Sequence, residues 1–222
     1  MKIGIFDSGI GGTTVLAAIK SLLGETAHEY FYLADSENCP YGEKSDAELW
    51  EIVTKNVEAL KTWGAKIVVI ACNTATTKCI KPLREKYPDL TFVGTEPAIK
   101  LAANSAAKNI LILATPATIG SERTAALVKE NQKPDQAITL LPCPGLADTI
   151  EKCLESDPAK IDAKLAELFG APNTEYDAVV LGCTHYPLIK DKLEPYFSNA
   201  KLLDGALGVA HRVESLLESP EN

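Results

Sequence analysis

Two segments, half a chain apart, share one pattern. Each is a short run of β-branched and apolar residues that leads to a cysteine and then to hydrogen-bonding side chains; the first is residues 66–75, with Cys72, and the second is residues 178–187, with Cys183. A continuous Val- and Ile-rich run is typical of a strand buried in a parallel sheet, where functional residues gather at the carboxyl ends. The pattern therefore predicts an α/β chain with a cysteine at the end of each of two strands.

Short apolar runs alternate with segments of helical periodicity along the whole chain. The expected strands are residues 2–6, 30–34, 67–71, 91–94, 108–114, 138–141, the run from 178, and 201–203. The expected helices are residues 13–23, 45–63, 74–87, 98–107, one after 121, two within 146–169, 188–195 and 205–218. Strands that alternate with helices form a parallel, doubly wound sheet. Because the second half repeats the order of the first, we expect two α/β halves.

Composition and charge exclude several classes of partner. The chain of 222 residues has 46% hydrophobic and 23% charged residues, a net charge of −8 and a pI near 5.0. Phosphate backbones and anionic membranes attract basic surfaces, so neither a nucleic acid nor a membrane is expected as a partner. A small anionic substrate is still compatible with this charge, because local backbone N–H groups can bind it.

The expected compartment is the cytoplasm. The N-terminus lacks the long apolar core of a signal peptide, and no run approaches the roughly 18 apolar residues of a membrane helix. In a reducing compartment the six cysteines are expected to be thiols rather than disulfides. No metal site is expected, since there is no C-x-x-C pair and the chain has only three histidines.

A glycine-rich turn follows the first expected strand. Asp7 and Ser8 come directly after that strand, and residues 9–12 lead into a helix. This order aims backbone N–H groups at an anion, although the spacing is not that of a dinucleotide site. The turn also has a purely structural explanation, since a tight turn needs glycine by itself; Asp7 and Ser8 favour a site.

The two cysteines allow four interpretations. They can be packed strand-end residues, or form a disulfide, which the compartment disfavours. Cys183 can be a nucleophile with His185 as its base, which leaves Cys72 without a role. The fourth possibility is a pair of thiol bases on opposite faces of one substrate carbon, as the inversion of a stereocentre beside a carboxylate requires. Asp7 and His185 would then adjust the protonation of the nearer thiol.

Four motifs taken together resemble the glutamate racemases of the aspartate/glutamate racemase superfamily. They are residues 7–12 (DSGIGG), 40–42 (PYG), 71–75 (ACNTA) and 181–187 (LGCTHYP), and the resemblance runs from Lys2 to about Asp204. It implies a two-base racemase without a cofactor, which makes D-glutamate for peptidoglycan in the bacterial cytoplasm. It also implies two α/β domains, residues 1–97 with 204–222 and residues 98–203, with the active site between them.

The resemblance assigns roles to individual residues. Cys72 would take the proton from D-glutamate with help from Asp7, and Cys183 would take it from L-glutamate with help from His185. Glu151 would lie near His185. The substrate contacts would come from Asp7, Ser8, Tyr41, Gly42, Asn73, Thr74, Thr118, Thr184 and His185.

Alternatives remain within and outside this family. An aspartate racemase, or another member acting on a related amino acid, would carry the same thiol pair, and a non-catalytic amino-acid-binding relative would keep the pocket. An acyl-transfer enzyme would need Cys183 but not Cys72. The family usually continues with a further strand and helix where this chain stops at Asn222. The oligomeric state is therefore open, a homodimer included.

Overall fold

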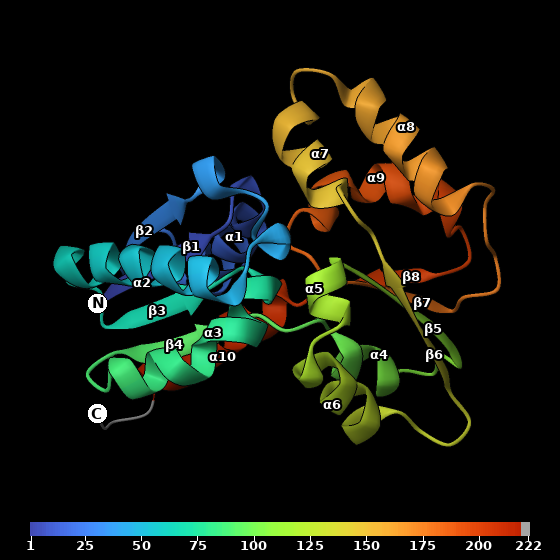
Figure 1. Ribbon diagram of the computed structural model, residues 1–222. Helices are drawn as coiled ribbons and strands as arrows, with labels where there is room; N and C mark the ends of the chain where they lie inside the picture. The colour runs from blue at the N-terminus through green and yellow to red at the C-terminus, as the bar shows by residue number, and fades with distance from the viewer. Residues whose placement is uncertain (219–222) are drawn as a thin grey trace. The chain divides into compact units, whose positions relative to one another are not determined.

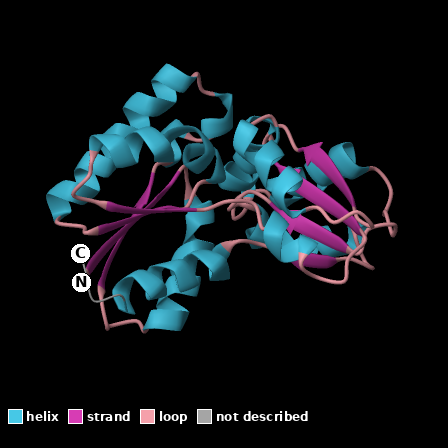
Figure 2. Ribbon diagram, turned by 90° about the horizontal axis from the view of Figure 1, so that it is seen from below, coloured by secondary structure: helices cyan, strands magenta, loops and turns pink. Residues whose placement is uncertain are grey.

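The computed structural model describes residues 1–218, and the chain divides into two compact units. Unit 1 is Met1–Glu96 with the chain from Gly205 onward, and unit 2 is Pro97–Asp204. Each unit is a four-stranded, all-parallel sheet with helices packed on both faces (Figures 1 and 2). The prediction of two α/β domains with parallel sheets is confirmed.

Unit 1 is built on the strand order β2-β1-β3-β4. Its strands are β1 (Lys2–Asp7), β2 (Glu29–Ala34), β3 (Ile67–Ile70) and β4 (Thr91–Gly94). Its helices are η1 (Ile10–Gly12), α1 (Thr13–Leu23), η2 (Ser36–Asn38), η3 (Tyr41–Glu43), α2 (Asp46–Trp63), α3 (Asn73–Lys86) and α10 (Ala206–Glu218). The predicted start of α2 is confirmed, because the Ser45 side chain accepts a hydrogen bond from the Glu48 N–H at 3.3 Å.

Unit 2 has the strand order β6-β5-β7-β8. Its strands are β5 (Asn109–Ala114), β6 (Ala137–Pro142), β7 (Ala178–Leu181) and β8 (Lys201–Leu203). Its helices are α4 (Ile99–Ala103), α5 (Pro116–Ile119), α6 (Glu122–Asn131), α7 (Leu146–Cys153), α8 (Pro158–Phe169), η4 (Tyr186–Ile189), α9 (Lys190–Leu193) and η5 (Glu194–Tyr196).

The two units have the same topology. In each, the first strand lies in the middle, the second strand forms one edge, and the third lies between the first and the fourth. The edge strands β2 and β6 even share one alternation of exposed and half-buried residues. The helix after the fourth strand is exchanged, because α4 follows β4 but belongs to unit 2, whereas α10 follows β8 but packs on α1 and β4 of unit 1. The structure therefore has the form of an internal duplication.

The central strands of each sheet are buried on both faces, as their continuous apolar runs predict. In β1, Ile3 and Ile5 face α1 and α10, whereas Phe6 faces α2 and α3. In β5, Ile110 and Ile112 face α4 and α6, whereas Leu111 and Leu113 face α7 and α8. Side chains alternate across a strand, so a run that is apolar at every position must be covered on both sides.

Two predicted helices differ from the structure. The helix expected at residues 98–107 ends at Ala103, because the Ser105 hydroxyl donates to the Ala102 carbonyl and then accepts from the Ala107 N–H. This local hydrogen bonding competes with a continuing helix. The helix expected at residues 188–195 is broken into η4, α9 and η5, and Pro195, which has no N–H to donate, lies in η5.

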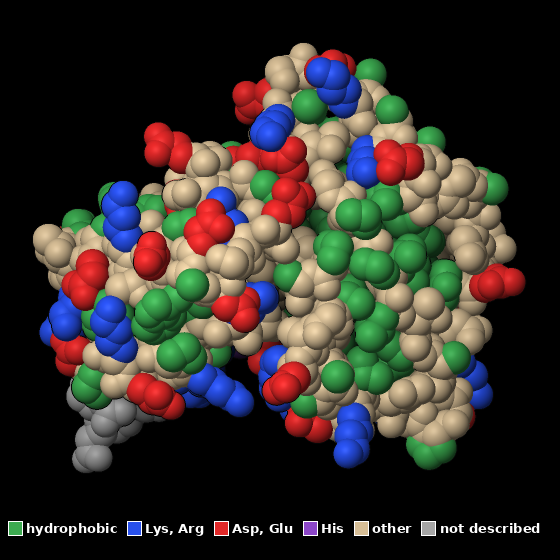
Figure 3. All heavy atoms as spheres, viewed as in Figure 1, with side chains coloured by type: hydrophobic (Ala, Val, Ile, Leu, Met, Phe, Trp, Pro, Cys, Tyr) green, Lys and Arg blue, Asp and Glu red, His purple; other side chains and the backbone are tan. Residues whose placement is uncertain are grey.

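One face of the molecule is mixed in charge. Over the face in Figure 3, Lys and Arg side chains lie among Asp and Glu side chains.

Among the described residues, no helix is both long enough and apolar enough to cross a membrane.

The thiol of Cys79 should make stability depend on pH. Cys79 lies on the buried face of α3, and burial raises its pKa to about 11. An unfolded thiol ionises near pH 8.5, so above that pH the unfolded state loses its proton first. Stability from this group is complete below about pH 8.5 and decreases by up to about 1.4 kcal/mol per pH unit between pH 9 and 11.

This expectation is tested by urea unfolding of the wild type and Cys79→Ala across that pH range. The wild-type free energy of unfolding should fall more steeply with pH than that of the variant. Equal slopes would show that Cys79 ionises at its ordinary value in the folded protein.

Candidate active site

The carboxyl ends of β1 and β3 bring the predicted residues of unit 1 together. The two strands are neighbours, with Phe6 paired to Ile70, so Asp7 and Cys72 emerge at the same edge of the sheet. Asp7, Ser8 and Cys72 are all buried. This edge is where open α/β sheets bind their ligands.

Cys72 lies at the amino end of α3. The N–H groups of Ala75 and Thr74 and the side chain of Ser8 face its sulfur and favour the thiolate. Burial has the larger effect and, together with the Asp7 carboxylate, raises the pKa of Cys72 to about 12. At neutral pH the Cys72 side chain is therefore a neutral thiol. The Ser8 side chain and the N–H groups of Thr74 and Ala75 can stabilise the thiolate that forms when the thiol gives up its proton.

Asp7 is held by the glycine-rich turn. The Gly12 N–H donates to the Asp7 carboxylate at 2.9 Å, and the Asp7 side chain is fully buried. A Cβ atom at position 12 would lie 2.6 Å from the Asp7 Cβ and 2.8 Å from the Tyr32 hydroxyl. Glycine is therefore needed at position 12 for the backbone to approach the Asp7 carboxylate.

Asn73 and Thr74 form the first turn of α3, directly after Cys72. Both are buried, and among the described residues the Asn73 Oδ1 atom has no hydrogen-bond partner. A buried acceptor without a partner is costly, so it suits a ligand that brings its own donor. An amino group has that chemistry.

Tyr41 is fully enclosed, and its hydroxyl is already engaged inside unit 1. The hydroxyl donates to the Asp35 carboxylate at 2.6 Å and accepts from the Asn56 amide at 2.8 Å. Burial, followed by the bond to Asp35, raises the pKa of Tyr41 far above its ordinary value. Gly42 follows it, half-buried, in η3, so the backbone of this turn is the part that a ligand can reach. The predicted contact of Tyr41 with a substrate stays a prediction.

Sequence reasoning missed Asp35 and Asn56. Asn56 lies on the buried face of α2, among Val53, Val57 and Leu60. A polar residue that interrupts an apolar helical stripe was the signal that could have revealed it.

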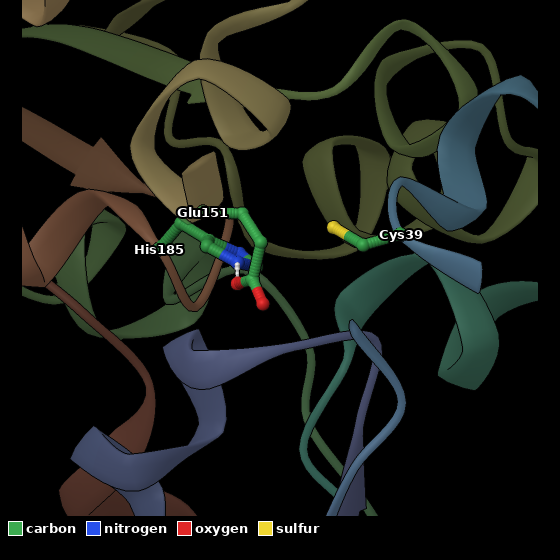
Figure 4. A group of neighbouring side chains, drawn as sticks. All are labelled: Cys39, Glu151 and His185. Carbon is green, nitrogen blue, oxygen red and sulfur yellow. Dashed lines mark hydrogen bonds and ion pairs between the residues drawn. The ribbon is translucent and has the colours of Figure 1, made fainter. Parts of the chain in front are cut away.

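In unit 2, Cys183 has a different set of neighbours. It follows β7, and its sulfur lies 3.8 Å from the Nδ1 atom of His185. The Nε2 atom of the same ring lies 2.8 Å from the Glu151 carboxylate, which comes from α7 (Figure 4). Both His185 and Glu151 are almost completely buried. The arrangement is that of a thiol, an imidazole and a carboxylate in series, in which the carboxylate orients the ring.

The remaining predicted residues of unit 2 lie at the same edge of its sheet. Thr184 is buried in the turn between Cys183 and His185. Thr118 is buried in α5, after the neighbouring strand β5, and its hydroxyl lies 3.1 Å from that of Thr115. Tyr186 is fully buried, and both Cys183 and Cys143 raise the pKa of its hydroxyl beyond the effect of burial.

Gly182 should be intolerant of a side chain. A Cβ atom there would lie 2.9 Å from the Leu113 carbonyl and 3.0 Å from the Ala114 Cβ. Gly182→Ala must therefore displace the backbone just before Cys183, which we expect to cost about 1–3 kcal/mol of stability and about a hundredfold in turnover. Urea unfolding and steady-state kinetics measure the two effects.

Gly208→Ala is the matched control, because a Cβ atom at this exposed position of α10 has nothing within 4 Å. It should keep full turnover and gain up to about 1 kcal/mol of helix stability. Equal turnover in the two variants would contradict the displacement of Cys183.

The two cysteines are topologically equivalent. Cys72 follows β3 and Cys183 follows β7, and these are the third strands of two sheets with the same strand order. Their neighbours differ, since a carboxylate lies beside Cys72 and an imidazole lies beside Cys183. The fold thus places one cysteine after the third strand of each unit, and each of these two thiols has its own proton partner.

Comparisons with known proteins agree with this arrangement. The Asp/Glu/Hydantoin racemase family model matches residues 3–212. A glutamate racemase of Clostridium novyi is 38% identical over 98% of this chain and 83% of its own length. A second one, glutamate racemase 2 of Bacillus subtilis, is 39% identical over 98% of this chain and 82% of its own length.

A solved structure has the same fold. The Escherichia coli glutamate racemase in complex with L-glutamate and the activator UDP-MurNAc-Ala superposes with a TM-score of 0.87 and is 33% identical. The match covers 98% of this chain and 82% of that structure. With two equivalent sheets, a cysteine after the third strand of each and a family match over nearly all of its length, the chain belongs to the Asp/Glu/hydantoin racemase family.

Proposed function

We propose that this protein interconverts L- and D-glutamate with two cysteine bases and no cofactor. The observation that carries the proposal is the equivalence of Cys72 and Cys183, one thiol in the same place in each of two like-folded units. An enzyme that treats two mirror-image substrates alike needs two like bases, and a duplicated fold supplies them. Glutamate as substrate is supported by the curated relatives and by the L-glutamate complex of the relative described above.

The reaction from L- to D-glutamate begins at Cys183. Its thiolate takes the α-proton of L-glutamate, and the electron pair of the broken C–H bond passes into the carboxylate as an ene-diolate. The Cys72 thiol then gives its proton to the opposite face of the same carbon. The products are D-glutamate, a Cys183 thiol and a Cys72 thiolate, so protons and charge balance.

The raised pKa of Cys72 suits this direction. A thiol that holds its proton up to about pH 12 is a competent donor when a carbanion forms beside it. The thiolate that remains would be stabilised by the Ser8 side chain and the N–H groups of Thr74 and Ala75. Asp7 is the neighbour that can return a proton to it or take one away.

His185 and Glu151 would exchange protons with Cys183, as Asp7 would with Cys72. The ring accepts the thiol proton at Nδ1, and the Glu151 carboxylate stabilises the imidazolium that results. The cycle is reset when these partners exchange the protons of the two thiols with water.

The developing negative charge on the substrate would be stabilised by backbone N–H groups and by the hydroxyls of Ser8, Thr74, Thr118 and Thr184. The half-buried Gly42 turn and the unpartnered Asn73 Oδ1 would hold the ends of the amino acid.

In the cell, the D-glutamate formed would serve peptidoglycan synthesis in the cytoplasm, the role that the resemblance implies.

The test is racemisation in heavy water without pyridoxal phosphate. Starting from L-glutamate, circular dichroism should decay to zero, and every D-glutamate formed should carry deuterium at the α-carbon. L-Aspartate serves as the competing substrate, and faster turnover of aspartate would move the assignment to an aspartate racemase. If neither amino acid exchanges its α-proton from either enantiomer, the two-base proposal is wrong.

A further inference from the structure

A polar network of buried and half-buried residues lies beneath the turn that contains Tyr41. The Asp35 network consists of Asp35, Asn38, Tyr41 and Asn56, all in unit 1. One oxygen of the Asp35 carboxylate accepts from the Tyr41 hydroxyl at 2.6 Å and from the Asn56 amide at 3.1 Å; the other accepts from the Asn38 amide at 2.8 Å. The Asn56 amide also donates to the Tyr41 hydroxyl at 2.8 Å.

The network connects three elements of unit 1 that are separate in the sequence, namely the end of β2, the middle of α2 and η3. Asp35 follows β2, and its N–H donates to the Asp7 carbonyl at 3.0 Å. Asn56 lies in the middle of α2. Tyr41 begins η3, which packs against α3, the helix that Cys72 precedes. Tyr41 and Cys72 belong to the same buried core cluster of unit 1.

Core packing alone does not explain Asn56. It is 7% exposed and stands among fully buried apolar residues of α2, where a polar side chain is costly unless it is hydrogen-bonded. Its two hydrogen bonds both go to the network and none to the backbone of α2. A residue placed in this way fixes the orientation of its partners.

We propose that Asn56 is a positioning residue for the Cys72 half of the reaction. Through Tyr41 and Asp35 it holds the turn of residues 40–42 against the start of α3, and so it fixes the surroundings of the Cys72 sulfur. The proposal rests on the two-base function above and adds that one half of the cycle depends on α2. Cys183 belongs to unit 2, whereas the network lies in unit 1, so the Cys183 half of the cycle should be spared.

The variants are Asn56→Leu, which removes both donated bonds, and Tyr41→Phe, which removes one hydroxyl and leaves the Asn56–Asp35 bond. Val53→Ala is the control. Val53 is a fully buried residue one turn earlier on α2, so the substitution leaves a core cavity but removes none of the network's hydrogen bonds.

The first readout needs no substrate. Iodoacetamide labelling of Cys72 is measured by peptide mass spectrometry relative to Cys183 in the same molecules. The ratio should rise about tenfold in Asn56→Leu, because a lost buried hydrogen bond favours local opening around Cys72. It should rise less in Tyr41→Phe and stay at the wild-type value in Val53→Ala.

The second readout uses α-deuterated D- and L-glutamate. Since the equilibrium constant of a racemisation is one, kcat/KM must fall equally in both directions. The primary isotope effect can still become one-sided. In Asn56→Leu it should increase with D-glutamate, whose proton goes to Cys72, and decrease with L-glutamate.

The two proposals fail in different ways. A wild type that does not racemise glutamate would end the proposed function, and the labelling ratio would then decide the role of Asn56 by itself. Where the wild type is active, the positioning role would be overturned if Asn56→Leu kept the wild-type isotope effects with both D- and L-glutamate. It would also be overturned if the Cys72-to-Cys183 labelling ratio of Asn56→Leu equalled that of Val53→Ala.

Discussion

Replacing either Cys72 or Cys183 by serine is expected to lower the turnover of racemisation by about a thousandfold or more. A hydroxyl is a far weaker acid than a thiol, so serine can neither take the α-proton nor hold the charge afterwards. Both residues are buried at the carboxyl ends of equivalent strands, and a serine fills nearly the same space. The loss should therefore appear in turnover, with the fold retained by circular dichroism.

The two variants should differ in which enantiomer they still exchange. In Cys72→Ser, Cys183 can still remove the proton of L-glutamate and return a deuteron to the same face, so L-glutamate acquires deuterium without inversion. Cys183→Ser should do the same with D-glutamate only. Proton magnetic resonance of each enantiomer in heavy water measures this exchange.

This pattern separates the two-base mechanism from acyl transfer. An enzyme with Cys183 as nucleophile and His185 as base would lose activity in Cys183→Ser and keep it in Cys72→Ser. A mechanism with one reacting thiol cannot explain a loss of inversion in both variants together with exchange of L-glutamate in Cys72→Ser and of D-glutamate in Cys183→Ser.

Replacing His185 by asparagine is expected to slow racemisation by about a hundredfold. The ring joins the Cys183 sulfur, at 3.8 Å, to the Glu151 carboxylate, at 2.8 Å, and asparagine cannot accept and release a proton in its place. The effect should fall on the Cys183 half of the cycle. The primary isotope effect should therefore rise with α-deuterated L-glutamate and fall with the D-enantiomer, opposite to the expectation for Asn56→Leu.

Glu151→Gln is the graded companion of this variant. The amide keeps a polar partner for His185 but removes the charge that stabilises the imidazolium, so we expect a smaller loss of about tenfold. A loss in His185→Asn with balanced isotope effects would show that the imidazole serves binding rather than proton transfer at Cys183.

The periodicity of the sequence predicted most of the secondary structure, because it reports burial along the chain itself. The runs before Cys72 and Cys183 are apolar at every position, and each became a strand covered on both faces. The start of α2 was predictable for a similar reason, since the Ser45 cap is a contact between near neighbours. Where short-range hydrogen bonds compete, as at Ser105, the helical pattern overestimated the length of the helix.

The neighbours of each cysteine could be predicted only in part. Asp7, Ser8 and Cys72 meet because adjacent parallel strands end at one edge, which follows from strand order once the fold class is known. The pairing of Glu151 with His185 came from the resemblance, since nothing local in either segment indicates it. The structure makes that contact by packing α7 against η4.

The sequence by itself determined the fold class, the two α/β halves and the two strand-end thiols, because each depends on patterns within a few residues. Only the tertiary structure decided that the Tyr41 hydroxyl is engaged by Asp35 and that Asn56 completes their network. These features depend on hydrogen bonds and packing between residues far apart in the chain. No local pattern encodes which distant partner a buried polar group will meet.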